Sequence, residues 1–89
     1  LPVYVNKKEK SKVNDVEKHK YLVPKNMTMG NFIYILRKSI KLKSDQALFV
    51  FVNNVIVCNS ELMSDIYSLH HDKNDKFLYV TYASENTFG

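Results

Sequence analysis

The sequence contains few of the residues that form cross-links and tight loops. Of its 89 residues, two are glycine, two are proline, one is cysteine and none is tryptophan. With Cys58 as its lone cysteine the chain cannot form an internal disulfide, which favours a reducing compartment such as the cytosol. With Gly30 and Gly89 as its only glycines, it has no glycine-rich loop of the kind that cradles phosphates. These shortages exclude a disulfide scaffold and a nucleotide-binding loop.

Long apolar runs are also missing. No run approaches the roughly 20 apolar residues that cross a bilayer as a helix, and no signal peptide is visible. Because the chain begins at Leu1 and not at Met, we expect it to be a piece of a longer polypeptide. Its length and its hydrophobic content of 45% suit one domain with a modest core.

Charge is distributed unevenly along the chain. Residues 1–43 hold eleven Lys or Arg and three Asp or Glu, a net charge of +8, whereas residues 44–89 hold two and six, a net charge of −4. A basic half is typical of proteins that bind nucleic acid, anionic lipid or acidic peptides, and equally of a solvated surface. No RNA-recognition signature accompanies it, so we keep nucleic-acid binding only as a minor alternative.

The pattern of β-type residues predicts five strands, at residues 2–5, 19–23, 47–52, 55–57 and 77–82. We expect 47–52 to be a central strand buried on both faces, and the pair Asn53-Asn54 to turn the chain with positive φ. Residues 6–17 are polar and rich in lysine, so we expect an exposed loop there.

Two helices are predicted between these strands. Apolar residues at spacings of three and four predict a helix over 28–41, with Thr28 as its N-cap and with Met29, Phe32, Ile33, Leu36 and Ile40 on its buried side. Ser60 could cap a second helix over 61–70, with Leu62, Met63, Ile66 and Leu69 on one face.

The resulting order, β-β-α-β-β-α-β, belongs to the α+β class. It fits a ubiquitin-like β-grasp, a mixed sheet with one long packed helix and a second short helix. We expect a ubiquitin-like domain over 1–83 and a flexible tail over 84–89, since the last residues are polar without a regular period. A terminal glycine has no Cβ, so its carboxylate can enter a narrow enzyme channel, which makes Gly89 a candidate for conjugation.

The stretch Lys18-His19-Lys20-Tyr21-Leu22-Val23-Pro24 has the composition of an edge strand. Lysines beside β-type residues commonly protect a sheet edge from unwanted pairing, and a proline cannot donate to a ladder. Such an edge leaves its backbone open to an extended peptide that adds as one more strand. The lysines would favour a peptide that carries acidic residues.

No pattern in the sequence supports catalysis, and we expect no enzyme, no cofactor and no metal. Cys58 with His70, His71 and Asp72 supplies the residue types of a thiol protease without any known local signature. The two histidines with Asp72 and Asp75 could touch a metal, but consecutive histidines point in different directions and the i, i+4 pairing of a zinc helix is absent.

Several blocks of the chain together resemble a known family. They are Lys20-Tyr21-Leu22-Val23-Pro24, the helix 32–38, the run 47–54, Leu62-Met63 with Ile66-Tyr67, and the strand 77–82 followed by Phe88-Gly89. In this order they resemble the autophagy ubiquitin-like modifiers, to which GABARAP and the microtubule-associated light chains belong. The resemblance covers the chain from about Pro2 to Gly89.

The resemblance implies a modifier whose terminal glycine is joined to phosphatidylethanolamine by an activating and a conjugating enzyme, and released by a cysteine protease. It implies a cytoplasmic protein that resides on autophagosomal or other organelle membranes when lipidated. There it would recruit receptors with an aromatic-x-x-aliphatic motif flanked by acids. A ubiquitin-like peptide-binding module that is never conjugated remains the alternative.

The resemblance also assigns residues to the peptide site. The aromatic pocket would be lined by Pro2, Lys20, Leu22 and Phe77. The aliphatic pocket would be lined by Tyr21, Val23, Pro24, Met27, Phe32 and Ile35. The acids would meet Lys18, Lys20 and Lys38. Family members carry two further N-terminal helices that complete the aromatic pocket, a basic residue in many cases at the position of Ser39, and Pro-Pro at Val57-Cys58.

Overall fold

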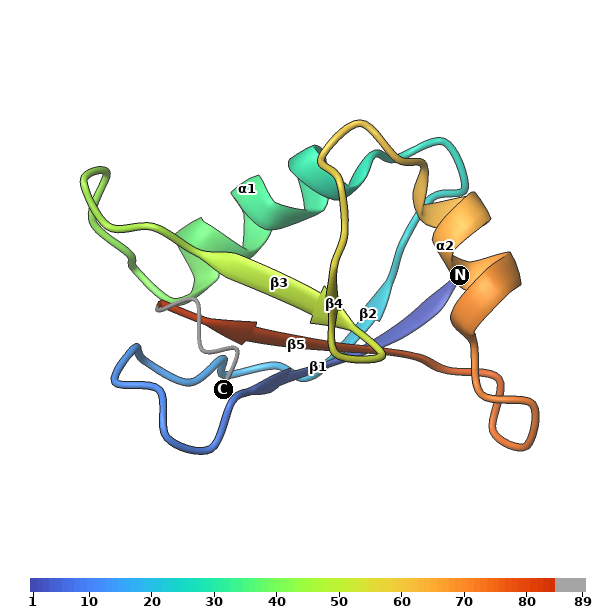
Figure 1. Ribbon diagram of the computed structural model, residues 1–89, viewed down its shortest axis with the longest axis horizontal. Coiled ribbons are helices and arrows are strands. Elements are labelled where there is room, and N and C mark those ends of the chain that lie inside the picture. Colours follow the sequence, from blue (N-terminus) through green and yellow to red (C-terminus); the bar gives the residue numbers. More distant parts are fainter. Residues whose placement is uncertain (85–89) are drawn as a thin grey trace.

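The computed structural model describes residues 1–84 and contains the elements in the predicted order (Figure 1). These are β1 (Pro2–Lys7), β2 (Lys20–Leu22), α1 (Met29–Ser39), β3 (Phe49–Val52), β4 (Val55–Ile56), α2 (Met63–His70) and β5 (Leu78–Ala83). The strands form one sheet in the order β2-β1-β5-β3-β4. The pair β1–β5 is parallel and the other pairs are antiparallel. The predicted fold class, a mixed sheet with one long and one short helix, is confirmed.

The core lies between the sheet and α1, which crosses one face of it (Figure 1). Alternate residues of a strand point to opposite faces, and the burial follows that rule. Val3 and Val5 of β1 lie in register with Leu78 and Val80 of β5, and all four are fully buried. Tyr4, between the two valines, is only half-buried. One face of the sheet is therefore dry, and the other is partly open to water.

Helix α1 forms as its periodicity predicts. Met29, Phe32, Leu36 and Ile40 are all buried, and the Thr28 hydroxyl accepts a hydrogen bond from the Asn31 amide at 3.2 Å, which confirms the N-cap. The helix ends at Ser39, two residues before the predicted end.

The first turn of α1 is tied to the loop before α2. The amides of Met29 and Gly30 donate to the carbonyls of Glu61 and Asn59 at 2.8 and 2.9 Å. A Cβ on Gly30 would lie 3.3 Å from the Asn59 carbonyl oxygen, which is tighter than an ordinary contact. Glycine therefore stands here because another backbone comes close.

Two expectations for the second helix are wrong. Its N-cap is Leu62 and not Ser60, and no side chain caps it; the Met63 amide donates instead to the Met27 carbonyl at 2.8 Å. A backbone partner from a distant segment thus replaces the local cap. Leu69 leaves the buried face and is 76% exposed, because the helix packs through Met63, Ile66 and the half-buried Tyr67.

The segment predicted as an exposed loop is only partly exposed. β1 continues to Lys7, and Ser11, Val13 and Val16 are buried. The Asn14 amide group donates to the Ile40 carbonyl at 2.9 Å, and the Tyr82 hydroxyl donates to the Asn14 carbonyl at 2.8 Å. These bonds fasten the loop to the end of α1 and to β5.

The third strand is shorter than predicted. β3 begins at Phe49, and Ala47 is exposed. Val50, Phe51 and Val52 are buried, as expected of an inner strand, although β1 and β5 lie nearer the middle of the sheet. The turn is confirmed, since Asn53 and Asn54 have φ values of 51° and 64°.

Two leucines of contrasting exposure test where stability resides. Leu36 is fully buried under the sheet, so Leu36→Ala should lower the free energy of unfolding by about 2–5 kcal/mol through lost burial and the cavity left behind. Leu22 is 86% exposed, so Leu22→Ala should change it by less than about 0.5 kcal/mol. Urea unfolding followed by circular dichroism measures both, and equal losses would contradict this assignment of the core.

The buried tyrosine of β5 predicts a loss of stability in alkali. Burial raises the pKa of Tyr82 to about 12 from the ordinary 10.0. Because the folded-state pKa lies above the unfolded one, the contribution of Tyr82 is complete below pH 10 and is lost as the pH rises towards 12. Tyr82→Phe should lower the free energy of unfolding by about 1 kcal/mol near neutrality. The difference in unfolding free energy between this variant and the unsubstituted protein should shrink as the pH rises from 10 towards 12. Tyr34→Phe, at a 60% exposed position, is the control and should show no such convergence.

Candidate peptide-binding site

Strand β2 lies at an edge of the sheet. Among residues 1–84, it pairs with another strand on one side only. Val23, just after the strand, exchanges two hydrogen bonds with Leu1, at 2.8 and 2.9 Å. In an antiparallel ladder the bonded residues alternate, so Tyr21 also directs its backbone to β1, while Lys20 and Leu22 direct theirs outward. The edge inferred from the lysine-flanked sequence is thus present, with two residues available to pair with another strand.

A hollow of about 440 Å³ lies beside this open edge. Its lining consists of Pro2, Lys18, Lys20, Tyr21, Leu22 and Phe77. All four residues predicted for the aromatic pocket are among them. Pro2 and Leu22 are paired in register, whereas Phe77 comes from the segment just before β5. The hollow is mostly apolar, and the ammonium group of Lys20 lies 5.9 Å from the centre of the Phe77 ring.

An aromatic cluster on the open face of the sheet supports Phe77. The Tyr4 ring stacks on His19 with centroids 5.6 Å apart, meets Phe77 edge-on at 6.2 Å and lies 5.7 Å from Tyr79. Such pairs are stabilised beyond the area they bury. The sequence interpretation did not include Tyr4, His19 or Tyr79 in the site. For Tyr4 and Tyr79 the available signal was their alternation with buried valines and a leucine, which places them on the face away from the core. His19, between Lys18 and Lys20, carries no such signal.

The loop before β5 is held to this cluster through an acid. The Tyr79 hydroxyl donates to the Asp75 carboxylate. This bond raises the pKa of Tyr79 to about 12 and lowers the pKa of Asp75. The Asp75 carboxylate also accepts from the Phe77 amide at 2.9 Å. The same acid therefore orients the backbone of Phe77 and one ring of the cluster behind it.

The residues predicted for the aliphatic pocket lie on the other face, between β2 and α1, and differ in exposure. Val23 and Phe32 are core residues, 4% and 1% exposed. The Tyr21 ring is half-buried and meets the Phe32 ring edge-on at 5.7 Å. Met27 is also half-buried. Pro24 and Ile35 are exposed, so they are the residues of this group that a ligand can reach directly.

The three lysines predicted to meet acids are not equally placed. Lys18 and Lys20 line the hollow beside β2, with the Lys18 ammonium 5.3 Å from the centre of the Tyr21 ring. Lys38 lies on α1 over the Tyr34 ring at 4.6 Å and lines a different hollow. A cation over a ring face is attracted by the quadrupole of the ring. Two of the three lysines therefore flank the hollow that the aromatic residue would occupy.

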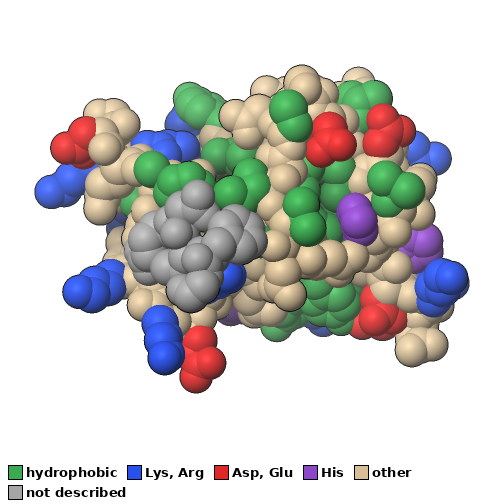
Figure 2. Space-filling model, viewed as in Figure 1, with side chains coloured by type: hydrophobic (Ala, Val, Ile, Leu, Met, Phe, Trp, Pro, Cys, Tyr) green, Lys and Arg blue, Asp and Glu red, His purple; other side chains and the backbone are tan. Residues whose placement is uncertain are grey.

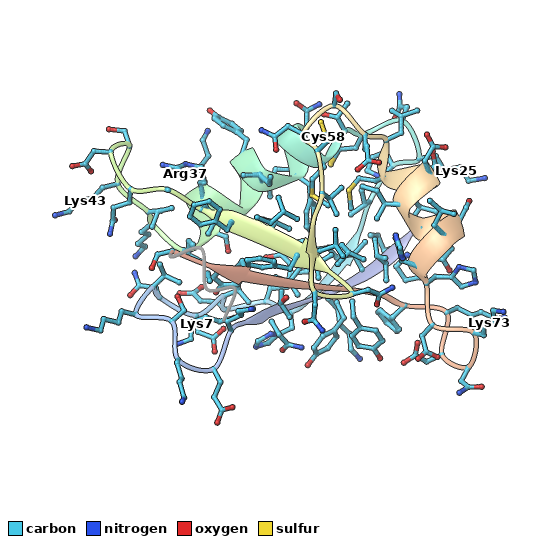
Figure 3. All side chains as sticks on the ribbon, in the orientation of Figure 1. Lys7, Lys25, Arg37, Lys43, Cys58 and Lys73 are labelled. Atoms are coloured by element: carbon cyan, nitrogen blue, oxygen red, sulfur yellow. The ribbon has the colours of Figure 1, made fainter. Side chains whose placement is uncertain are left out.

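The remaining candidates show other arrangements. Cys58 is exposed on the loop before α2 (Figure 3), and its sulfur lies 3.2 Å from the Ser60 hydroxyl, a contact that lowers the pKa of the thiol. His70 and His71 bond instead to the Asn53 side chain and to the Tyr67 carbonyl. Within residues 1–84 no group of three or more His, Cys, Asp or Glu could hold a metal ion, and no helix has the length and apolarity to cross a bilayer.

The predicted tail begins at Ser84, whose amide donates to the buried Ser11 hydroxyl at 3.2 Å. Its candidate conjugation residue, Gly89, lies outside the described residues.

The chain matches known proteins over its whole length. The family model described as "Autophagy protein Atg8 ubiquitin like" matches residues 1–89. Autophagy-related protein 8e of Arabidopsis thaliana is 52% identical, with 100% of this chain and 72% of that protein covered. Autophagy-related protein 8 of Saccharomyces cerevisiae is 51% identical, with 100% and 75% covered.

Solved structures agree with these relatives. Atg8 of Trypanosoma brucei superposes with a TM-score of 0.90 at 40% identity, and covers 100% of this chain and 76% of its own. Plasmodium falciparum Atg8, solved in complex with an Atg3 peptide, superposes with a TM-score of 0.86 at 33% identity, and covers 99% and 78%. The chain therefore belongs to the Atg8 family of ubiquitin-like autophagy proteins.

Proposed function

We propose that this protein is a membrane-conjugated modifier that recruits partners through the open edge of β2. Its carboxyl group at Gly89 would form an amide with the amine of phosphatidylethanolamine, with loss of water. A free carboxylate is a poor electrophile, so the reaction requires an activating and a conjugating enzyme, and a cysteine protease would reverse it. Family membership supports this proposal, and the same membership supports residence on autophagosomal membranes after lipidation.

The observation that carries the recruiting function is the unpaired edge of β2 beside an apolar hollow. An added strand would satisfy the outward backbone groups of Lys20 and Leu22, as in other peptide complexes that extend a sheet. Lys18 and Lys20 beside the same hollow would attract acids in the peptide. The protein itself would act as a scaffold and would catalyse no reaction.

The spacing of the aromatic-x-x-aliphatic motif fits the two faces of this edge. Side chains three positions apart in a strand point to opposite faces. An aromatic residue in the hollow lined by Leu22 and Phe77 would therefore place the aliphatic residue on the side of α1, where Pro24 and Ile35 are exposed. A motif with one or three residues between its anchors would place both on one face.

The conjugating enzyme is a second partner that the comparisons favour. In the Plasmodium relative, Atg8 is bound to a peptide of Atg3. We extend that interaction to this chain and propose that a peptide of its conjugating enzyme competes with receptor peptides for β2. Such competition would keep a molecule that is bound to its conjugating enzyme from binding receptors at the same time.

Leu22 and Leu69 provide a matched test of the peptide site. Both are leucines that are largely exposed, at 86% and 76%, and only Leu22 lies beside the hollow. Leu22→Ala should weaken binding of an aromatic-x-x-aliphatic peptide by about 10- to 100-fold, the equivalent of one buried leucine side chain. Leu69→Ala should leave the affinity unchanged. Peptide titration followed by NMR measures both affinities and locates the site, and shifts centred away from β2 would refute the assignment.

Gly89 tests the conjugation. In a reconstituted system with both enzymes and vesicles containing phosphatidylethanolamine, Gly89→Ala should slow formation of the adduct by about 100-fold, because the added methyl displaces the reacting carbonyl. Asn86→Ala, in the same tail, should conjugate normally. Intact mass after extraction from native cells then separates a conjugated modifier from a module that only binds peptides, since the latter would never carry the mass of a lipid.

A further inference from the structure

Part of the basic charge of the N-terminal half gathers in three dimensions at one end of the molecule. Figure 2 shows Lys and Arg side chains gathered at the left end of the view, and Figure 3 labels Lys7, Arg37 and Lys43 there. Lys25 and Lys73 are labelled at the opposite end. The end with the three labelled cations is formed by the loop after β1, the end of α1 and the loop before β3 (Figure 1).

Two adjoining hollows at this end are lined by cations. The first, of about 240 Å³, has Arg37, Lys38 and Lys41 in its lining, together with Tyr34, Leu42 and Ser44. The second, also about 240 Å³, has Lys12, Lys41 and Lys43 in its lining, together with Val13, Asn14, Ile40, Leu42 and Gln46. Among residues 1–84, neither lining includes a carboxylate. We call the five cations Lys12, Arg37, Lys38, Lys41 and Lys43 the basic strip.

Only some of these cations have a role in contacts within the protein. The Arg37 guanidinium donates to the Lys43 carbonyl at 2.8 Å and so holds the loop before β3 in place. Two cations in the last turn of α1 suffice to complement its dipole. Lys12, Lys41 and Lys43 are all exposed, and Lys41 also lines a neighbouring hollow that includes Asp15 and Glu17. Three lysines therefore face water around a common hollow.

The end of β5 lies beside the strip. The Lys8 amide donates to the Tyr82 carbonyl at 2.8 Å, and the Ser84 amide donates to the Ser11 hydroxyl, next to Lys12. Gly89 lies five positions beyond Ser84 in the sequence. A chain of that length spans at most about 18 Å. A lipid at Gly89 would therefore hold the strip close to the surface of the bilayer.

We infer that the basic strip is a docking surface for anionic phospholipid headgroups, which orients the conjugated protein on its membrane. The inference rests on the proposed conjugation for its location, because a tether at Gly89 brings these lysines within reach of the headgroups. Phosphate and carboxylate groups of the lipids would occupy the two hollows. Tyr34, 60% exposed beside Lys38, would lie at the level of the headgroups, where tyrosine is favoured.

Docking in this orientation has a consequence for the peptide site. The strip lies at the end of α1 and in the loops beside it, whereas the hollow for the aromatic residue is formed by β2 with Pro2 and Phe77. None of Lys12, Lys41 and Lys43 lines that hollow. The membrane contact would thus leave the edge of β2 open to the cytosolic side, so that a docked protein still recruits receptors.

The test uses the unconjugated 89-residue chain, so that its outcome is independent of the lipidation reaction. Binding is measured by co-sedimentation with phosphatidylcholine vesicles that either contain or lack phosphatidylserine. The strip variant is Lys12→Gln, Lys41→Gln and Lys43→Gln. The control variant, with the same change in net charge, is Lys25→Gln, Lys73→Gln and Lys76→Gln. Circular dichroism confirms that both variants fold, as expected for exposed lysines.

The unsubstituted chain should bind the anionic vesicles and should not bind the neutral ones. Its affinity for the anionic vesicles should fall as the ionic strength rises to about 0.15 M. The strip variant should lose on the order of 100-fold in affinity, because each lysine near an anionic surface contributes about a factor of five. The control variant should bind nearly as well as the unsubstituted chain. Equal losses in both variants, or no loss in the strip variant, would overturn the inference.

A parallel titration with single-stranded RNA distinguishes the other polyanion. If the strip variant loses RNA binding while the unsubstituted chain ignores anionic vesicles, the strip is a nucleic-acid surface and the inference is wrong. If conjugation fails in the reconstituted system but vesicle binding follows the strip, the docking surface stands and the proposed modifier function does not.

Discussion

Among residues 1–84, strand β2 pairs with a neighbour on one side alone, and the rest of the structure depends on this constraint. Every backbone amide and carbonyl needs a partner, and those of Lys20 and Leu22 face outward at the edge of the sheet. Water satisfies them in the free protein. An exposed edge of this kind invites aggregation, and its three-residue length and flanking lysines limit that risk. The same features leave the edge usable by a short peptide rich in acids.

The two faces of the sheet differ in how deeply their side chains are buried. The face under α1 is closed by fully buried residues such as Val3, Leu36 and Val80, and hydrophobic burial there supplies most of the stability. The opposite face carries an aromatic cluster around Tyr4, which supports the hollow at Phe77. Because the two sets alternate along the same strands, residues of the outer face can change with little effect on the core.

Much of the fold follows from local patterns. The spacing of apolar residues predicts α1, and Thr28 and Asn53-Asn54 act as cap and turn because their side chains and backbones suit those geometries. The failures have a common cause. Ser60 is not a cap because a backbone carbonyl of a distant segment takes its role, and Val13 and Val16 are buried because the loop is bonded to Tyr82 and α1. Residues distant in the sequence therefore determine the capping of α2 and the burial of these two valines.

The sequence by itself determined the class of the fold and the open strand, because periodicity, capping and lysines at an edge act over a few neighbouring residues. The family followed from the resemblance of whole blocks of sequence. Only the tertiary structure decided which residues share a site. Leu22 and Phe77 are distant in the chain, and they meet because β1 pairs with both β2 and β5. The lysines at 12, 41 and 43 meet in the same way, through bonds that join the loop to the end of α1. Long-range pairing brings such residues close together in space, and no local pattern encodes that proximity.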